Sequence, residues 1–296
     1  MIQEDALIPY QTSPIPKGPW LVFAPHPDDE SLGMGGSLLL AASEGIDVVL
    51  VVLTDGSLGG TMVDEDKFVR LREQEAREAA RRLHLKAIHF WRQKDRQLQA
   101  TPELVDRVAE SVRVEKPASV FFPSPLELHP DHRAAALLVW QGLQRCPDFN
   151  GKAYSYEISV QCQANLLIDI TSVAEEKAAI LAVYQSQLKE NDYKGVVQAL
   201  NKARTYTLPS EIEFAEAFFA YEDVASSDLA ALTLSSLRPY WQKALGSTIP
   251  LVSVITRTKD RPRMLRKAME SVAEQTYPNI EALVINDGGD DVADIV

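Results

Sequence analysis

The chain has 296 residues, and its 46% hydrophobic and 24% charged residues are ordinary proportions for a soluble globular protein. Its formal net charge of −12 and the lack of a basic patch or stripe argue against a nucleic-acid-binding protein. No apolar run approaches the ~20 residues of a membrane span, and the proline-interrupted N-terminus lacks the apolar region of a signal peptide.

The predicted elements alternate between strands and helices. Three prolines between residues 1 and 18 predict an irregular N-terminal arm. Apolar and β-branched runs predict strands at residues 20–24, 48–53, 87–91 and 120–122, and apolar residues at helical spacing predict helices at residues 34–44, 68–83, 102–114 and 132–143. This alternation is typical of an α/β domain, which we expect to be Rossmann-like, with three layers and a mostly parallel sheet.

Beyond residue 152 the pattern is less regular. Residues 166–170 predict a further short strand, and residues 173–188 predict a helix with Thr171 and Ser172 as its cap. We expect the domain organisation to be an arm at residues 1–18, a main domain at 19–222, a linker with one weak helix at 223–248 and a β-α-β fragment at 249–296.

Two histidine-containing motifs stand in the segments where such a sheet binds ligands. Parallel sheets bind ligands beyond the carboxyl ends of their strands, and the corresponding segments here are residues 25–31, 54–60, 92–96 and 123–132. The first segment contains His26-Pro27-Asp28-Asp29-Glu30 and the last contains His129-Pro130-Asp131-His132. The two motifs hold three of the five histidines of the chain.

The residue types in these motifs suit a hydrolytic metal centre. Catalytic zinc usually takes three His, Asp or Glu ligands and keeps a fourth position for water, whose pKa it lowers to about 7. Two histidines and one aspartate could supply the ligands, and a second aspartate could take the proton of the water. The third histidine could stabilise the oxyanion or protonate the leaving amine.

The same motifs allow a purely structural interpretation, in which Asp28, Asp29 or Asp131 caps the helix that follows. Two such motifs at adjacent strand ends of one sheet favour the metal centre over this alternative. The remaining histidines, His84 at a helix end and His89 in a strand, have no such context, and we interpret them as structural.

The sequence resembles the PIG-L/LmbE-like deacetylases. These are zinc-dependent hydrolases of N-acetylglucosamine-type groups and include enzymes of mycothiol, bacillithiol and glycolipid-anchor synthesis. The two motifs carry the resemblance, which covers roughly residues 19–222. Weaker marks are Thr54-Asp55-Gly56, Arg72-x-x-Glu75 and Tyr184-x-Ser186-Gln187.

The resemblance implies a zinc site and a reaction. His26, Asp29 and His132 would bind Zn²⁺, the one cofactor we expect, and Asp28 would be the general base that acts on the metal-bound water. The substrate would be an N-acetylated sugar or glycoconjugate. The reaction would be hydrolysis of its acetamide in glycan or glycolipid biosynthesis.

The resemblance also implies roles for the groups around the metal. His129 would stabilise the oxyanion or act as the acid, and Asp131 would orient a neighbouring histidine. Arg72 would contact the substrate, although it could instead be a solvated helix residue paired with Glu75. Some members have a tyrosine two residues before the second motif that helps to polarise the carbonyl. This chain has Glu127 there, so its part in carbonyl polarisation stays open.

Residues 249–296 resemble the opening β-α-β of family 2 glycosyltransferases with the GT-A fold. A strand at residues 251–255 opens the pattern, and in that family the aspartate that corresponds to Asp287 contacts the nucleotide base of the donor. Asp290 and Asp291 come too early for the metal-binding D-x-D, and we interpret them as loop charge. A truncated fragment of about 48 residues is too short to bury a stable core alone, so we expect no glycosyltransferase activity.

Two alternatives to sugar deacetylation stay open. The same ligand set suits an amidase that cleaves a thiol-sugar conjugate. The main domain could also be a non-catalytic sugar-binding module attached to a glycosyltransferase, although the complete set of expected ligands and the base favour an enzyme.

The two cysteines, Cys146 and Cys162, bear on the location of the protein. Two cysteines are too few to stabilise a fold of this size by disulfide bonds, and they do not have the close spacing of metal-binding cysteines. We therefore expect reduced thiols and a cytoplasmic location. The sequence does not indicate an oligomeric state.

Overall fold

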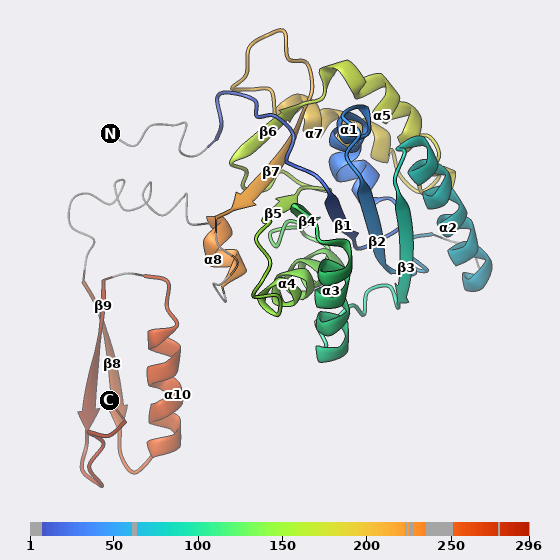
Figure 1. The fold of residues 1–296 in the computed structure, drawn as a ribbon. Helices are drawn as coiled ribbons and strands as arrows, with labels where there is room; N and C mark the ends of the chain where they lie inside the picture. Colours follow the sequence, from blue (N-terminus) through green and yellow to red (C-terminus); the bar gives the residue numbers. More distant parts are fainter. Residues whose placement is uncertain are drawn as a thin grey trace. The chain divides into compact units, whose positions relative to one another are not determined.

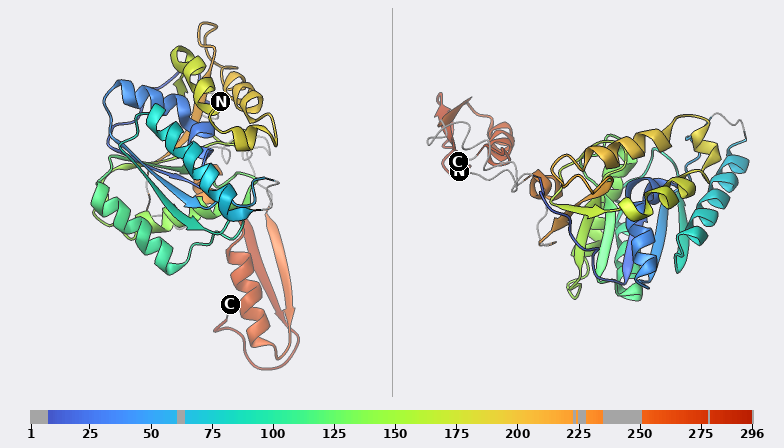
Figure 2. Two further views of the ribbon diagram at one scale, coloured as in Figure 1. Left: turned by 90° about the vertical axis from the view of Figure 1, so that its right-hand side faces the viewer. Right: turned by 90° about the horizontal axis from the view of Figure 1, so that it is seen from above.

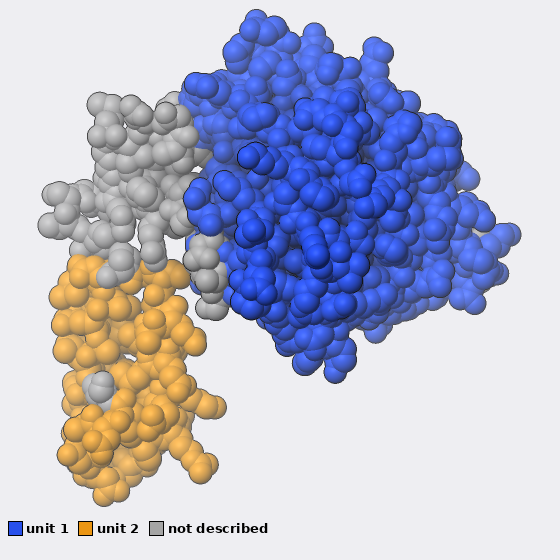
Figure 3. All heavy atoms as spheres, in the orientation of Figure 1, with its two compact units in different colours: residues 1–236 blue, residues 237–296 orange. Residues whose placement is uncertain are grey.

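The computed structural model describes residues 8–60, 64–222, 224, 228–234, 251–277 and 279–295. The chain divides into two compact units, residues 1–236 and residues 237–296 (Figure 3). Each unit has its own sheet and is described by itself. The finer domain limits drawn from the sequence stay predictions.

The first unit is built on a seven-stranded sheet (Figure 1). Its strands are β1 (Trp20–Ala24), β2 (Val48–Thr54), β3 (Ala87–Gln93), β4 (Ser119–Pro123), β5 (Lys152–Tyr156), β6 (Leu166–Asp169) and β7 (Ala215–Tyr221). The spatial order is β3-β2-β1-β4-β5-β7-β6, and the neighbours from β3 to β5 pair in parallel. Strand β7 runs antiparallel to both of its neighbours, so the expected mostly parallel sheet is confirmed.

Helices cover both faces of this sheet (Figures 1 and 2). They are α1 (Asp29–Ser43), α2 (Glu65–Arg82), α3 (Pro102–Glu115), α4 (Pro130–Gln144), α5 (Ala174–Leu181), α6 (Gln185–Leu188), α7 (Tyr193–Ala203) and α8 (Leu229–Leu234). Leu21 and Phe23 of β1 pack in one core cluster with α3 and α4, whereas Trp20 and Val22 pack in a second cluster with α1 and α2. The alternation buries both faces and gives the expected three layers.

The strand order places a topological switch point between β1 and β4. The chain moves outward from β1 through β2 to β3, and then returns to the other side of β1 with β4 and β5. The connections on the two sides diverge, and they leave a crevice beyond the carboxyl ends of β1 and β4. The two histidine motifs follow these two strands, so the topology alone brings them together.

The helix predicted over residues 173–188 is wrong. It is broken into a 3₁₀ turn (Thr171–Val173), α5 and α6, and α5 begins without a side-chain cap. Thr171 Oγ1 instead accepts hydrogen bonds from Glu213 N and Phe214 N. Tyr184 lies in the break between α5 and α6, and its hydroxyl makes a contact distant in sequence, donating to Glu30 Oε1 at 2.8 Å. Local helical periodicity cannot show such a contact.

Helix α1 begins five residues before the predicted start at Met34. The backbone is kinked at Met34, with φ −142° and ψ 21°, and the first part of the helix carries Asp29 and Glu30. Glu216 of β7 supports the kink, because its carboxylate accepts hydrogen bonds at 2.7 Å from Gly36 N and Ser37 N. The charged first turn of α1 is therefore part of the helix rather than of the loop before it.

The second unit is a single β-α-β element. Strands β8 (Val252–Thr258) and β9 (Ile280–Asn286) pair in parallel, and α10 (Pro262–Ala273) connects them. This confirms the β-α-β fragment expected at the C-terminus. Across the described residues of both units, no helix combines the length and the apolarity that a membrane crossing needs.

Candidate active site

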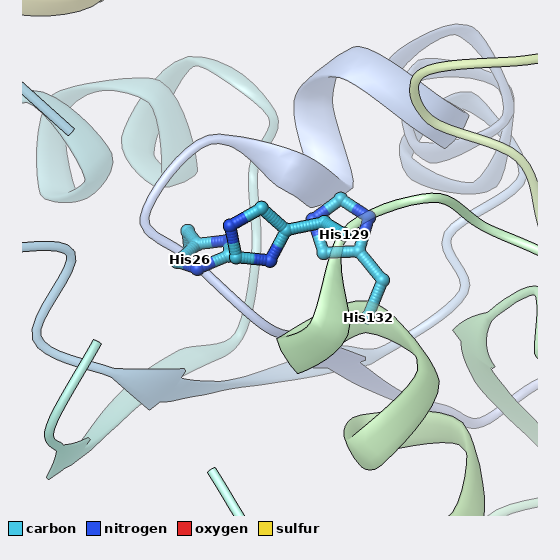
Figure 4. A group of neighbouring side chains, drawn as sticks. All are labelled: His26, His129 and His132. Atoms are coloured by element: carbon cyan, nitrogen blue, oxygen red, sulfur yellow. The ribbon is translucent and has the colours of Figure 1, made fainter. Parts of the chain in front are cut away.

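Three histidines from the two motifs gather at the switch point (Figure 4). His26 lies in the loop between β1 and α1, and His129 and His132 lie at the start of α4. The ring centroids are 4.7 Å apart for His26 and His129, 5.3 Å for His26 and His132, and 5.0 Å for His129 and His132. One ring nitrogen of each lies within 4.8 Å of the others, so two loops about one hundred residues apart converge on one point.

Asp29 lies between two of these rings. Its Oδ2 atom is 2.9 Å from His26 Nδ1 and 3.3 Å from His132 Nε2. Ligand atoms 2.0–2.2 Å from a tetrahedral zinc ion are roughly 3.3–3.6 Å from one another. The separations from Asp29 Oδ2 to the two histidine nitrogens are close to that value, so Asp29 could share a metal ion with either histidine. The group of histidines whose ring nitrogens all lie within 4.8 Å of one another is His26, His129 and His132.

In His26 and His132, the ring nitrogen that does not face Asp29 faces another carboxylate. His26 Nε2 is 3.3 Å from Asp131 Oδ2 and 3.4 Å from Asp95 Oδ1. His132 Nδ1 is 3.4 Å from Glu127 Oε2. Metal-ligating histidines commonly donate their second N–H to a carboxylate, which fixes the tautomer and the ring orientation. Both rings therefore aim their remaining nitrogen at Asp29.

A second group of possible metal ligands lies at Nε2 of His26, the ring nitrogen that does not face Asp29. A nitrogen of His26 and carboxylate oxygens of Asp95 and Asp131 also lie within 4.8 Å of one another. Asp131, however, already accepts hydrogen bonds from two backbone amides, Arg96 N at 2.6 Å and Leu98 N at 3.2 Å. Asp29 Oδ2 likewise accepts a hydrogen bond from a backbone amide, His26 N at 2.9 Å, so backbone contacts alone do not separate the two groups of possible ligands.

The electrostatics of the group favour a positive charge at its centre. Burial lowers the pKa of His26, but Asp29, Asp131 and Asp95 outweigh it and raise that pKa well above the usual value. Burial also opposes the shift at His132, yet Asp29 and Glu127 raise its pKa to about 9. The pKa of the Asp29 carboxyl shifts in the opposite direction. Burial alone would raise it, but His132 and His26 hold it well below the usual value.

Asp28 is the spare carboxylate beside this group. It precedes α1 but makes no side-chain cap, so the capping alternative is wrong for Asp28. Its Oδ2 accepts a hydrogen bond from Arg72 Nη2 at 3.0 Å. Burial raises the pKa of Asp28, and the charge of Arg72 opposes this only in part. A carboxylate with a raised pKa is a better proton acceptor at neutral pH.

Arg72 is buried, with 2% of its surface exposed, so the alternative of a solvated helix residue is wrong. Its Nη1 donates to Gly56 O at 2.9 Å, and its Nε has no partner among the described residues. Gly56 has φ 61°, and a Cβ there would lie 2.4 Å from Arg72 Nη1, so only glycine fits. Glu75, the suggested partner of Arg72, instead accepts hydrogen bonds from Ser186.

His129 and Asp131 occupy the first turn of α4. His129 is the N-cap, and its Nδ1 accepts a hydrogen bond from Asp131 N at 3.2 Å. Burial, together with His26 and His132, lowers the pKa of His129, so its ring is neutral near pH 7. Asp131 does not cap the helix, because its carboxylate turns toward His26 and the backbone of residues 96 and 98.

Glu127 does not face the cavity. It is 1% exposed, and its Oε1 accepts hydrogen bonds from Ile158 N at 2.6 Å and Ser159 N at 3.0 Å. Its other oxygen faces His132 Nδ1. Glu127 therefore contacts His132 and the backbone of residues 158 and 159, and it does not line the cavity.

A cavity of about 310 Å³ opens onto these groups. Asp28, Arg72, Asp95, Arg96 and His129 form a polar part of its lining, and Leu32, Leu58, Ile158, Tyr193 and Val197 contribute apolar surface. Sequence analysis did not single out Asp95, although it lies in a segment recognised as a strand end, and it missed helix α7 altogether. The volume lies within the range of small-molecule sites.

A polar cavity of this kind, at the switch point of a Rossmann-like sheet and beside residues that could hold a metal ion, is typical of an enzyme active site. Comparisons with known proteins identify the family. Residues 21–143 match the PIG-L family, described as GlcNAc-PI de-N-acetylase. Residues 253–296 match glycosyl transferase family 2.

Individual relatives agree with this assignment. The diacetylchitobiose deacetylase of Thermococcus kodakarensis is 32% identical over 188 residues, which are 58% of this chain and 70% of that protein. A probable N-acetyl-alpha-D-glucosaminyl L-malate deacetylase 2 of Bacillus subtilis is 28% identical over 182 residues, 56% of this chain and 82% of that protein. The chain belongs to the PIG-L deacetylase family, and the expected membership is confirmed.

The fold of a solved relative matches as well. The inhibitor-bound N,N'-diacetylchitobiose deacetylase from Pyrococcus horikoshii superimposes with a TM-score of 0.61 and 26% identity. The match covers 68% of this chain and 82% of that one. The chain is therefore an enzyme of the deacetylase class, a hydrolase of amide bonds. The similarity to glycosyl transferase family 2 is confined to residues 253–296.

Proposed function

We propose that the chain hydrolyses the N-acetyl amide of an N-acetylglucosamine-type sugar, with zinc bound by His26, Asp29 and His132. One observation carries the proposal: Asp29 Oδ2 lies within 3.3 Å of a nitrogen of both histidines, and the spare carboxylate of Asp28 lines the same cavity. The relatives support the substrate class, since those named above are deacetylases of N-acetylated sugars.

The reaction adds water to the acetamide carbonyl and breaks the C–N bond, which gives acetate and a free amine. A zinc ion held by the three ligands would supply a Lewis acid that polarises the carbonyl and makes water more acidic. Asp28 takes the proton of the attacking water, and Arg72 keeps the Asp28 carboxylate in place. Arg72 also lines the cavity, where it can contact the sugar.

His129 serves the opposite end of the reaction. Its ring lies beside those of His26 and His132 and lines the cavity. From this position its Nε2–H can donate a hydrogen bond to the developing oxyanion. The proton that Asp28 takes from the water passes to the leaving amine, which restores the Asp28 carboxylate. Asp131 and Glu127 act through the histidines that they hold and are positioning residues.

The substrate context is part of the proposal. The fragment similar to a glycosyltransferase suggests a role in glycan or glycolipid biosynthesis, because fused domains often serve one pathway. The cytoplasmic location stays a prediction based on the two unpaired cysteines.

The test combines metal content with acetate release. The purified chain is loaded with zinc, its zinc content is measured, and acetate is assayed with N-acetylglucosamine, diacetylchitobiose and N-acetylglucosamine glycosides. We expect one zinc ion per chain and acetate from at least one sugar. A folded, zinc-loaded protein that releases no acetate from any of them refutes the proposal. Faster cleavage of thiol-sugar conjugates in competition would favour the amidase alternative.

A further inference from the structure

Arg96 is a charged residue at the cavity that the proposed chemistry does not use. Its side chain is exposed and lines the cavity together with Asp95 and His129. The nearby carboxylates are engaged elsewhere: Asp28 pairs with Arg72, and Asp95 faces His26. Among the described residues no carboxylate forms an ion pair with Arg96, although the chain carries a net charge of −12.

The backbone of Arg96 has an unusual conformation. Its φ is 60°, in the left-handed region that residues with a Cβ seldom adopt and that is enriched at functional sites. Arg96 N donates a 2.6 Å hydrogen bond to Asp131 Oδ2, and the same oxygen lies 3.3 Å from His26 Nε2. One carboxylate thus fixes both a proposed metal ligand and the base of the Arg96 side chain.

This geometry limits where a ligand of Arg96 can be. The acetamide of the substrate must reach Asp28 and the proposed metal ligands. Arg96 begins at the edge of that group and lines the same cavity. A group that contacts its guanidinium therefore lies in the same cavity as the acetamide-bearing sugar, on that sugar or on its aglycone.

The chemistry of the guanidinium identifies the ligand. It stays charged at every physiological pH, and its forked N–H groups match a carboxylate or a phosphate in a bidentate arrangement. A neutral sugar hydroxyl needs no full charge opposite it. We propose that Arg96 is a specificity-determining residue that binds an anionic group, a carboxylate or a phosphate, on the substrate. This inference rests on the proposed function and narrows its substrate class to anionic N-acetylated glycoconjugates.

The test compares anionic with neutral substrates in matched variants. Arg96→Asn removes the charge and tolerates the left-handed backbone, and Arg96→Lys keeps the charge without the fork. Arg70→Asn is the control, because Arg70 is an exposed arginine of α2 that does not line the cavity. The substrates are diacetylchitobiose, N-acetylglucosamine 1-phosphate and an N-acetylglucosamine glycoside of a hydroxy acid, which separate phosphate from carboxylate.

The expected result is selective. In Arg96→Asn, kcat/KM for the anionic substrates falls about 10- to 100-fold, mainly through KM, and stays within about threefold for the neutral one. Arg96→Lys recovers part of the loss, Arg70→Asn matches the wild type, and added salt weakens the preference for the anions. An equal loss on neutral and anionic substrates overturns the inference, because Arg96 would then position the sugar or the loop.

A binding measurement separates this inference from the proposed function. Calorimetry with N-acetylglucosamine 1-phosphate and with N-acetylglucosamine needs no turnover. Tighter binding of the phosphate that is lost in Arg96→Asn supports the anion site, even if no substrate releases acetate and the proposed function fails. Phosphate affinity that is unchanged in Arg96→Asn places the anion elsewhere and overturns the inference.

Discussion

The two units share a strand-helix-strand pattern but differ in burial. Every residue of β1 and β2 is buried, whereas Thr258 is the one buried residue of β8 and no residue of β9 is buried. In the second unit, Ile255 is 64% exposed, Leu283 44% and Ile285 52%. Leu265 is the one buried residue of α10. The same local pattern therefore gives a tight core in one unit and an open apolar surface in the other.

The difference shows what a parallel sheet needs. Such a sheet is stable when helices cover both of its faces, and in the first unit α1 and α2 pack on one face while α3 and α4 pack on the other. In the described part of the second unit, α10 covers one face alone. A rigid, covered sheet can hold catalytic side chains in place, and this is why the chemistry is found in the first unit.

The largest expected effect is on catalysis. Asp28→Ala should lower kcat by about 10³-fold or more, because the attacking water loses its proton acceptor, while the zinc content stays unchanged. Acetate release and metal analysis on the same sample check both. The matched change in the second unit, Asp287→Ala, should leave kcat at the wild-type value. Loss of zinc in Asp28→Ala would mean that the roles of Asp28 and Asp29 are exchanged.

The second effect concerns a thiol in the first unit. Burial raises the pKa of Cys162 to about 12. At pH 8 its thiolate fraction, and hence its alkylation rate, should be about 10³-fold lower than for a free thiol. The rate should rise about tenfold per pH unit up to pH 12, because each unit deprotonates ten times more thiol. Mass spectrometry of iodoacetamide-treated protein measures this, and fast labelling at pH 8 would contradict the burial.

The third effect compares an ion pair from each unit. Lys177 Nζ donates at 2.7 Å to Glu216 Oε1, and both side chains are almost fully buried. Lys177→Met should lower the free energy of unfolding by about 3–5 kcal/mol, because it leaves Glu216 buried without its counter-ion. The exposed Arg257–Asp287 pair of the second unit should contribute at most about 1 kcal/mol, so Arg257→Ala has little effect.

Thermal or denaturant unfolding measures both variants. Equal destabilisation by Lys177→Met and Arg257→Ala would contradict the expected difference between the buried ion pair of the first unit and the exposed ion pair of the second. A Lys177→Met protein as stable as the wild type would show that the hydrogen bonds from Gly36 N, Ser37 N and Ser37 Oγ are sufficient to hold Glu216 in the core.

The smallest expected effect comes from removing the second unit. A chain of residues 1–236 keeps every residue of the proposed site, so its kcat and KM for a given sugar should stay within about twofold of those of the full chain. Acetate release by the two proteins at equal zinc content is the measurement. A large loss of activity in the shortened chain would assign the second unit a part in catalysis or in substrate binding.

Much of the first unit could be predicted from local sequence. Strand β1 has the predicted bounds, and the rule that ligands bind beyond strand ends located both histidine motifs. These predictions succeed because a buried strand requires a continuous run of apolar residues, and the end of that run is visible in the sequence. The residues that contact one another at the site were inferred from the family resemblance rather than from local pattern.

The features that the sequence did not predict involve contacts made by the fold. Tyr184, at the break in the predicted helix, contacts Glu30, and Glu127, whose role the sequence left open, contacts His132 and the backbone of residues 158 and 159. Asp95 reaches His26 from a different loop. Apart from Glu127 and His132, which are five residues apart, these partners are far apart in the sequence, so periodicity and spacing carry no signal for them.

We propose that the metal ion binds at Nδ1 of His26, the ring nitrogen that faces Asp29, and not at Nε2. The most direct measurement is a crystal structure of the zinc-loaded protein with anomalous scattering recorded at the zinc edge. We expect one peak bonded to His26 Nδ1, Asp29 Oδ2 and His132 Nε2, with Asp28 close by but not bonded. A peak between His26 Nε2, Asp95 and Asp131, or no peak within bonding distance of His26, would contradict it.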